Sequence, residues 1–494
     1  MRRTKHLPVA LPLVVLIAAC AGEPAERETD VMVMPVTTSS DAALADFKRG
    51  QHAMDMGRFF DAREYLETAV EADPDFALAH LGLANIANSA AEFVASLDAA
   101  EERAASVTEA ERILIEIARR GLDNDAEGQL QLAQQLVEIQ PESPRAWLQL
   151  AGIQSGLNNM EAAREAMLRA AELAPDFGLA YVLLGNSYIF NEPKDFDTAA
   201  EYMSRLVELE PEEPNAHDLM GDAYRAQNDL ANARDSYTRA AELAPDDALP
   251  LQQRGHVNSF LGDYDAARAD YDAAIARGRG NQKASFAVYR ALVSVHAGDP
   301  GAAVDELNEL VAEIDGMDIP GPLGQKIFAL TNAAQIALHH NMFDAAESIL
   351  EQRAALQLEQ AEQVGTDAAI RGARANIAYF EGVLAARKGD YRTATAKARE
   401  FMTLMEPDAN PRKNEPAHDL LGLVSLLRGD HEGAIEHYEQ ANPNNIYTQY
   451  HLGLAHEGAG NAAAAQEIIS GLAYNNFNNA GYALIRKDAL EKAR

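Results

Sequence analysis

The chain has 494 residues, 47% of them hydrophobic but only 6% aromatic, and its 76 acidic and 42 basic residues give a formal net charge of −34. The electrostatic field of this negative charge repels nucleic acid and anionic lipid headgroups, which both bind to basic surfaces, so no nucleic-acid partner is expected. The charge suits either a partner with basic segments or an acidic surface that only keeps the protein soluble.

The first predicted element is an export signal. Three basic residues among the first five precede an apolar run, residues 7–19, that is too short to span a membrane. The run ends in Ile17-Ala18-Ala19-Cys20, which resembles the lipobox of bacterial lipoproteins, with Ile17 where leucine is most common. The resemblance implies a signal peptide over residues 1–19 and a lipid on Cys20. Because Cys20 is the only cysteine, no disulfide or cysteine-based zinc site is expected.

Residues 20–42 are predicted to carry the lipid and to form a flexible tether, because proline, threonine, serine and charged residues interrupt any helical period. Ala21 stands where an aspartate would tend to retain a lipoprotein in the inner membrane of Gram-negative bacteria. By resemblance to that sorting rule, we expect the protein at the outer membrane, facing the periplasm. The inner membrane is the alternative.

A period of about 34 residues organises the rest of the chain. The octapeptide RAAELAPD occurs at 169–176 and again at 239–246. Each of four apolar stretches with helical period ends at a proline, at positions 141, 175, 211 and 245. Proline cannot continue a helix, so the spacing predicts two helices per unit. Since alanine is abundant and no strand-like alternation occurs, the predicted fold class is all-α.

The clearest unit covers residues 215–245. Its pattern positions are occupied by Met220-Gly221, Tyr224, Ala233, Tyr237, Ala240 and Pro245. This unit resembles the tetratricopeptide repeat, and the resemblance implies an α-solenoid, a right-handed superhelix of about twelve helix-turn-helix units. Gly221 and Ala233 are expected where the two helices cross, because bulk there would push them apart.

The repeats divide the chain into an N-terminal array over residues 43–314 and a more degenerate array over 327–479. Between them, residues 315–326 are rich in proline and glycine and form the predicted break, the best candidate for a hinge. Residues 480–494 are predicted to form a capping helix with a polar outer face, as the end of a solenoid requires.

No motif for catalysis or metal binding is complete. Residues 123–134 begin like a calcium loop, but Gln134 stands where a bidentate glutamate should close the site. His431 and His437 are six residues apart and diverge on a helix, unlike the paired histidines of zinc proteases. Neither a phosphate-binding glycine loop nor a serine nucleophile elbow occurs. We therefore predict that the protein is not an enzyme and has no cofactor or metal.

The family resemblance also implies a binding surface, because first helices in such arrays line a concave face that usually holds a peptide or a partner's helix. Carried over unit by unit, the inward positions are Asn186, Asp222 and His256, with Asn215, Asp218, Arg225 and Gln252 beside them. We expect these side chains to line an open groove without a packing role and to bind a protein or peptide partner. A solvated, unoccupied concave face is the alternative.

Two functions are compatible with these features. The first is a membrane-anchored periplasmic adaptor or scaffold in cell-envelope assembly or secretion, which binds a partner segment in its groove. The second is a fixed structural subunit of a larger envelope complex, such as one for pilus, secretin or polysaccharide export, without a transient ligand.

Overall fold

The computed structural model describes residue 34 and residues 36–494, except residues 88, 124, 318, 409 and 411. Within this part of the chain it contains twenty-five α-helices and no strand. Twelve consecutive helix pairs are followed by one single helix, which confirms the predicted α-solenoid of about twelve units. The predicted signal peptide and Cys20 lie outside the described residues.

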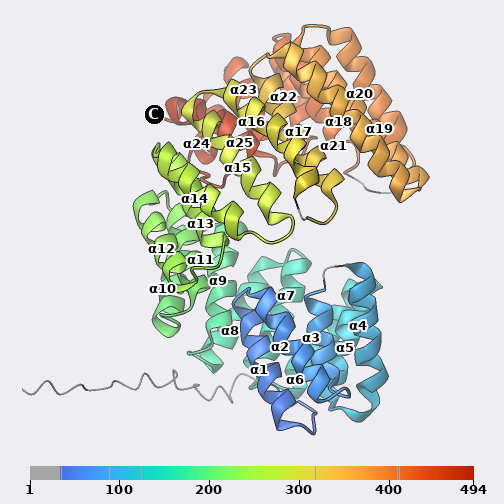
Figure 1. The fold of residues 1–494 in the computed structure, drawn as a ribbon, viewed down its shortest axis with the longest axis vertical. Helices are drawn as coiled ribbons and strands as arrows, with labels where there is room; N and C mark the ends of the chain where they lie inside the picture. The colour runs from blue at the N-terminus through green and yellow to red at the C-terminus, as the bar shows by residue number, and fades with distance from the viewer. Residues whose placement is uncertain are drawn as a thin grey trace, which may run out of the picture.

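The first helices of the pairs are α1 (Asp41–Asp55), α3 (Ala77–Asn85), α5 (Glu109–Leu122), α7 (Pro144–Gly156), α9 (Gly178–Phe190), α11 (Pro214–Ala226), α13 (Leu249–Leu261), α15 (Gln282–Ala297), α17 (Pro322–His339), α19 (Asp367–Arg387), α21 (Glu415–Leu427) and α23 (Ile446–Gly458). The second helices are α2 (Phe59–Ala72), α4 (Ala90–Arg103), α6 (Ala126–Ile139), α8 (Met160–Leu173), α10 (Phe196–Leu209), α12 (Leu230–Leu243), α14 (Tyr264–Arg277), α16 (Pro300–Glu313), α18 (Phe343–Val364), α20 (Tyr391–Met405), α22 (His431–Tyr438) and α24 (Ala462–Ala473). The one unpaired helix is α25 (Ala480–Lys492), and two short 3-10 turns, η2 (Ala104–Ser106) and η3 (Ile314–Gly316), lie within the array. Figure 1 shows α1–α8 in the lower part of the molecule, α9–α14 in the middle and α15–α25 in the upper part.

The turns between the two helices of a pair explain why a glycine followed by an aspartate recurs along the chain. Gly262 and Gly298 end their helices with positive φ angles of 82° and 86°, a conformation that glycine adopts without steric cost. An aspartate follows and caps the second helix by accepting a hydrogen bond from a backbone N–H three residues on. This cap is made by Asp229, Asp263, Asp299, Asp390 and Asp430. Asp125 of the calcium-like stretch is such a cap as well, on α6.

Close contact inside a pair depends on a glycine in the first helix. A Cβ atom built on Gly221 of α11 would lie 2.5 Å from the ring of Tyr237 on α12, which is fully buried. Gly422 of α21 and Tyr438 of α22 repeat this contact at 2.7 Å. The predicted crossing at Gly221 is therefore confirmed, and the bulky tyrosine fills the space that the glycine leaves.

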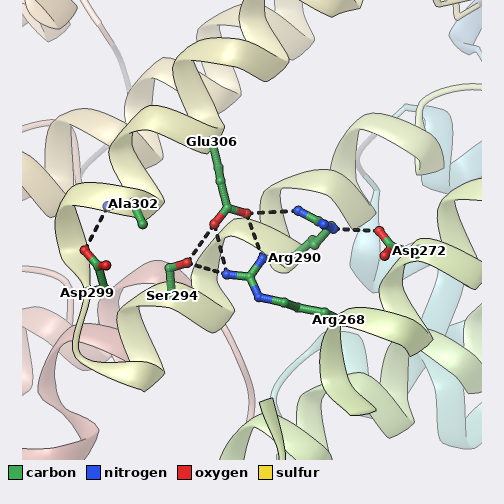
Figure 2. A network of polar contacts seen from close by, with 7 residues as sticks. All are labelled: Arg268, Asp272, Arg290, Ser294, Asp299, Ala302 and Glu306. Carbon is green, nitrogen blue, oxygen red and sulfur yellow. Dashed lines mark hydrogen bonds and ion pairs between the residues drawn. The ribbon is translucent and has the colours of Figure 1, made fainter. Parts of the chain in front are cut away.

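Neighbouring pairs are joined by polar contacts as well as by apolar packing. Figure 2 shows Glu306 of α16 between two guanidinium groups, those of Arg268 on α14 and Arg290 on α15. Arg268 donates to both Glu306 oxygens at 3.0 and 3.1 Å, and Ser294 donates its hydroxyl to Glu306 Oε1 at 2.7 Å. Arg290 also donates to Asp272 at 2.6 Å. One carboxylate thus connects three consecutive helices.

The ends of the predicted segments differ from the observed ones. The backbone and hydroxyl of Thr37 both donate to Glu111 at 2.7 Å, and α1 begins at Asp41, so the described end of the predicted tether is bound to the first units rather than free. Ile314 and Ala329, on either side of the predicted break, are fully buried in one continuous core. Of the predicted break, residues 315–316 belong to η3 and residues 322–326 to α17, so only a short connection separates these elements, and the core continues across it.

The last helix, α25, is more than a polar cap. Tyr482 and Ile485 are fully buried, and α25 packs against α15, α17 and α23. Because α15, α17 and α23 are all first helices of their pairs, α25 covers part of the face that those helices form. No helix in the described residues combines the length and apolar character needed to cross a membrane.

Candidate functional site

The predicted groove residues on α11 form a buried polar cluster. Arg225 Nη2 donates to Asp222 Oδ1 at 2.6 Å, and the hydroxyl of Tyr237 donates to the same oxygen at 2.6 Å. Arg225 also donates to Gln253 on α13 at 2.8 Å. The side chains of Asp222 and Arg225 are nearly inaccessible to solvent. The two charges therefore compensate each other inside the protein and link α11 to α12 and α13.

His256 on α13 is enclosed by aromatic side chains. Its Nδ1 lies 2.6 Å from the hydroxyl of Tyr271, its ring packs edge-on against Tyr289, and its Nε2 lies 3.0 Å from Gln252 Nε2. Burial, reinforced by the positive charge of Arg225, lowers the pKa of His256 well below its ordinary value. His256 is therefore neutral at pH 7 and serves the packing of its unit.

Two predicted groove residues keep an oxygen without a partner. Among the described residues, Asn186 Oδ1 on α9 and Asp218 Oδ1 on α11 are both buried and accept no hydrogen bond. Burial, together with the negative charge of Asp222, raises the pKa of the Asp218 carboxyl, although Arg225 opposes this shift. Arg225 Nε, a donor, is buried without a hydrogen-bond partner in the described part of the chain as well, so this part of the face has unmet acceptors and an unmet donor side by side.

Asn215 is occupied by the amino-terminal part of the chain. The turn between α1 and α2, residues 56–58, lies on the first helices of later units, where Asn215 donates a hydrogen bond to the carbonyl of Met56. Arg58 Nε is 3.2 Å from Glu213, and Met56 is buried in the core of α9–α11. The first unit thus covers one edge of the predicted groove.

The opposite edge is covered by the carboxy-terminal part of the chain. Residues 475–479, here called the crossing segment, join α24 to α25 outside any helix. Asn476 Nδ2 donates to the carbonyl of Arg225 at 3.3 Å, and Asn478 Nδ2 lies 3.1 Å from His256 Nδ1. Phe477 stacks on the Arg225 guanidinium, with 4.5 Å from its Cζ to the ring centroid. The chain's own residues therefore lie where a partner was expected.

The expectation of an open groove without packing roles is wrong for Asp222, Arg225 and His256. All three are buried, and each contacts a neighbouring helix or the crossing segment. These residues lie on first helices, Asp222 and Arg225 on α11 and His256 on α13. The repeat pattern contained no information on the distant segments that cover them.

An open cleft remains beside the crossing segment. It has a volume of about 1060 Å³ and lies between the carboxy-terminal ends of α9 and α11 on one side and α24 on the other. Two aromatic side chains in its wall are unusually exposed, Phe190 at 53% and Tyr474 at 43%. Lys194, Asp195 and Asp197 lie at its polar side. We call this feature the aromatic cleft.

The tyrosines of the second helices and the crossing segment have roles at this site that the sequence did not predict. The repeat pattern assigns Tyr237 and Tyr271 to packing alone, yet their hydroxyls bond to Asp222 and His256. The crossing segment does carry a sequence signal, since four asparagines surround one phenylalanine between two apolar helices. Such a run is too polar for a core helix, but its aromatic residue indicates a docked loop.

The candidate histidines of the sequence lie in packing environments. His437 on α22 faces His418 on α21, with 3.3 Å between their Nδ1 atoms, and the His339 ring packs against Tyr447. No group of three or more potential metal ligands occurs among the described residues.

Comparison with known proteins identifies the repeat. One family model described as tetratricopeptide repeat matches residues 47–111, 194–248 and 254–318, and a second model with the same description matches residues 144–177. The chain is 28% identical over 210 residues to anaphase-promoting complex subunit 3 of Schizosaccharomyces pombe. This match covers 42% of the chain and 31% of that relative, so the chain spans about a third of the relative's length.

Solved structures with similar helix arrays include MamA from Desulfovibrio magneticus RS-1 (TM-score 0.31, 18% identity, 34% of this chain and 94% of that chain). PilW, a type IV pilus biogenesis factor, gives a TM-score of 0.36 at 14% identity over 42% of this chain and 95% of that chain. Yeast Tom70 gives 0.41 at 14% identity over 85% of this chain and 96% of that chain. The family's models match the helix pairs in four separate stretches, so the chain contains tetratricopeptide repeats, a fold that supports a scaffold for protein–protein interaction.

Proposed function

We propose that the protein is a lipid-anchored periplasmic adaptor of the cell envelope that binds a partner protein at the aromatic cleft. The observation that carries the binding site is the exposure of Phe190 and Tyr474 in the wall of a cleft of about 1060 Å³. Exposed aromatic side chains grouped in a concavity are typical of interaction sites, because their burial stabilises a complex. The rest of this face is largely covered by the chain itself.

The partner is proposed to carry basic residues, since the chain has a formal net charge of −34. Long-range attraction to such a surface accelerates association and is screened by salt. Binding should therefore weaken as the salt concentration rises. Binding that is unchanged by salt would indicate a neutral partner.

The cleft is tested by replacing both exposed aromatics, Phe190→Asp with Tyr474→Asp. Introducing charge into an apolar contact should reduce co-purification of the partner from cross-linked envelope fractions at least about tenfold, the effect of ~1.4 kcal/mol. Val364→Asp, at a 60% exposed position on α18, is the matched control and should leave recovery unchanged. Equal recovery from all three proteins would refute the cleft as the binding site.

Stoichiometry separates the adaptor from the alternative of a fixed structural subunit. An adaptor is expected to recover its partner in a substoichiometric amount that falls on dilution. A constant ratio that survives dilution and purification would instead support the structural subunit.

The anchor is proposed from the lipobox-like sequence that ends in Cys20. Cys20→Ser removes the thiol that receives the lipid, so the protein should accumulate as an uncleaved precursor or appear in the soluble fraction. Membrane fractionation and mass spectrometry of the amino terminus measure both outcomes. A Cys20→Ser protein that matures normally and stays in the membrane would show that no lipid on this residue anchors the chain.

A further inference from the structure

The crossing segment runs over three consecutive first helices, as an extended ligand of a repeat array would. Asn476 contacts the end of α11, and Asn478 contacts both α13 and α15. On α15, Asn478 Oδ1 lies 3.1 Å from His296 Nε2. Residues from the far end of the sequence therefore lie on a surface that successive units form together. We call this surface, with Arg225, Asn228, His256 and His296, the track.

The contacts of this segment have a recognisable chemistry. Its asparagine carboxamides use both their donor and acceptor atoms: Asn476 donates to Asn228 Oδ1 at 2.8 Å and accepts from the Tyr482 hydroxyl at 3.1 Å. Phe477 lies between the Arg225 guanidinium and the ring of Phe190, at 4.5 and 5.5 Å. The track thus accepts one aromatic ring flanked by two carboxamides.

The segment is held differently from the helix that follows it. α25 is anchored by the fully buried Tyr482 and Ile485. In the crossing segment Asn476 is fully buried as well, but polar contacts hold it, and Phe477 and Asn478 are half-buried and are held by ring stacking and polar contacts. Asn476 has a positive φ of 54°, which costs energy for a residue other than glycine. Release of the segment therefore breaks polar contacts, including the hydrogen bond from the Tyr482 hydroxyl to Asn476, and leaves the apolar contacts of α25 in place.

Space for an exchange exists directly beside the segment. Phe477 and Asn475 form part of the wall of the aromatic cleft, together with the exposed Tyr474. An incoming chain can approach through this cleft while the crossing segment moves into it. Removal of the segment would expose Arg225, His256 and His296 together.

We propose that the crossing segment occupies the track in place of a partner segment of the same chemistry, an aromatic residue flanked by asparagine or glutamine, and that the partner binds by displacing it. This inference rests on the proposed function and specifies the partner's binding motif. Since the bound and displaced arrangements exchange, the apparent affinity for a partner is reduced by the fraction of molecules in which the segment is bound.

The probe is a fluorescent peptide with the sequence of residues 472–480, Leu-Ala-Tyr-Asn-Asn-Phe-Asn-Asn-Ala, added to the purified protein. In the protein, Phe477→Ala with Asn478→Ala weakens the competing segment and should increase peptide affinity about tenfold or more. Asn444→Ala, in the exposed loop before α23, is the control and should not change it. A peptide with alanine in place of Phe477 should fail to bind.

A second variant examines the track itself. Asn228 has a positive φ of 61°, so Asn228→Gly retains the backbone conformation and removes only the acceptor of Asn476. In the background of Phe477→Ala with Asn478→Ala, it should lower peptide affinity about fivefold. Unchanged affinity would mean that the peptide does not use the track.

Hydrogen exchange on the unmodified protein avoids any dependence on folding of the variants. Excess peptide should accelerate exchange of the amides of residues 475–479, while α25 stays protected. Unchanged exchange at saturating peptide, or equal binding of the peptide lacking Phe477, would overturn the inference. The proposed function would still stand if Tyr474→Asp alone reduces recovery of the partner, because Tyr474 lines the aromatic cleft and Phe190 also contacts Phe477.

Discussion

Single residues decide how closely the two helices of a unit approach. Gly221 leaves room for the ring of Tyr237, and the Tyr237 hydroxyl in turn donates to Asp222, the partner of Arg225. Steric fit and a buried charge pair therefore depend on one missing side chain. A change at this glycine affects both.

We expect Gly221→Ala to destabilise the protein by about 2 kcal/mol, because the new Cβ would lie 2.5 Å from the Tyr237 ring and must displace it. Alanine's better helix propensity offsets only about 1 kcal/mol of this loss. Thermal and urea unfolding should show a new early transition, because damage in a repeat array stays local.

Gly152→Ala on α7 is the control, since a Cβ atom added there would meet no atom within 4 Å apart from its own helix backbone. This variant should be neutral or more stable by up to about 1 kcal/mol. If both substitutions had the same effect, the close contact at Gly221 would not limit stability.

At the scale of helices, consecutive units are joined by side chains that serve more than one neighbour. Glu306 is the acceptor for Arg268 and Arg290, which come from the two preceding helices (Figure 2). Without it, the two guanidinium groups would remain close together without the carboxylate between them. The junction of α14, α15 and α16 therefore depends on a single carboxylate.

Glu306→Ala should lower the free energy of unfolding by about 1–2 kcal/mol, a modest value because these side chains are partly exposed and screened by water. Hydrogen exchange should increase in α15 and α16 and remain unchanged in α7. Glu309→Ala, an exposed carboxylate on the same helix, is the control. An equal loss in both variants would indicate that helix charge, rather than the network, is responsible.

At the scale of the whole molecule, several histidines are buried in the neutral state. Burial lowers the pKa of His296 to about 4 and that of His339 and His451 to about 3. As the pH falls below about 6.5, the ordinary pKa of histidine, these side chains bind protons in the unfolded chain but remain neutral in the folded chain. The folded state therefore loses stability as the pH falls from 6.5 toward 4, and keeps it above 6.5.

Each such histidine should contribute a loss of about 1.4 kcal/mol per pH unit below 6.5. The buried carboxyls of Asp218 and Asp419, whose pKa values are raised, oppose this trend. The test therefore compares two proteins. Between pH 6.5 and 5, the free energy of unfolding measured with urea should fall less for His451→Gln than for the wild type. Asn444→Ala, a change at an exposed residue that does not titrate, should retain the wild-type slope. Parallel slopes in all three proteins would contradict the assignment.

The sequence by itself determined the repeating unit. Helix pairs, their proline ends, the contact of Gly221 with Tyr237 and the polar line through Asp222 and His256 all follow from residues within one or two units of each other. Such features are local, because each unit buries its apolar face mainly against its nearest neighbours. The spacing of small, large and helix-ending residues therefore predicts the period of the units.

Only the tertiary structure decided what covers the face formed by the first helices. Asn215 meets Met56 across 159 residues, and Asn476 meets Arg225 across 251 residues. These contacts depend on the small rotation between successive units, which accumulates along the array until its two ends reach the same face. The total rotation depends on all units together, so no pattern within one unit predicts it. Side chains that the repeat places toward a groove are therefore buried by distant parts of the same chain without a sequence signal in their own units.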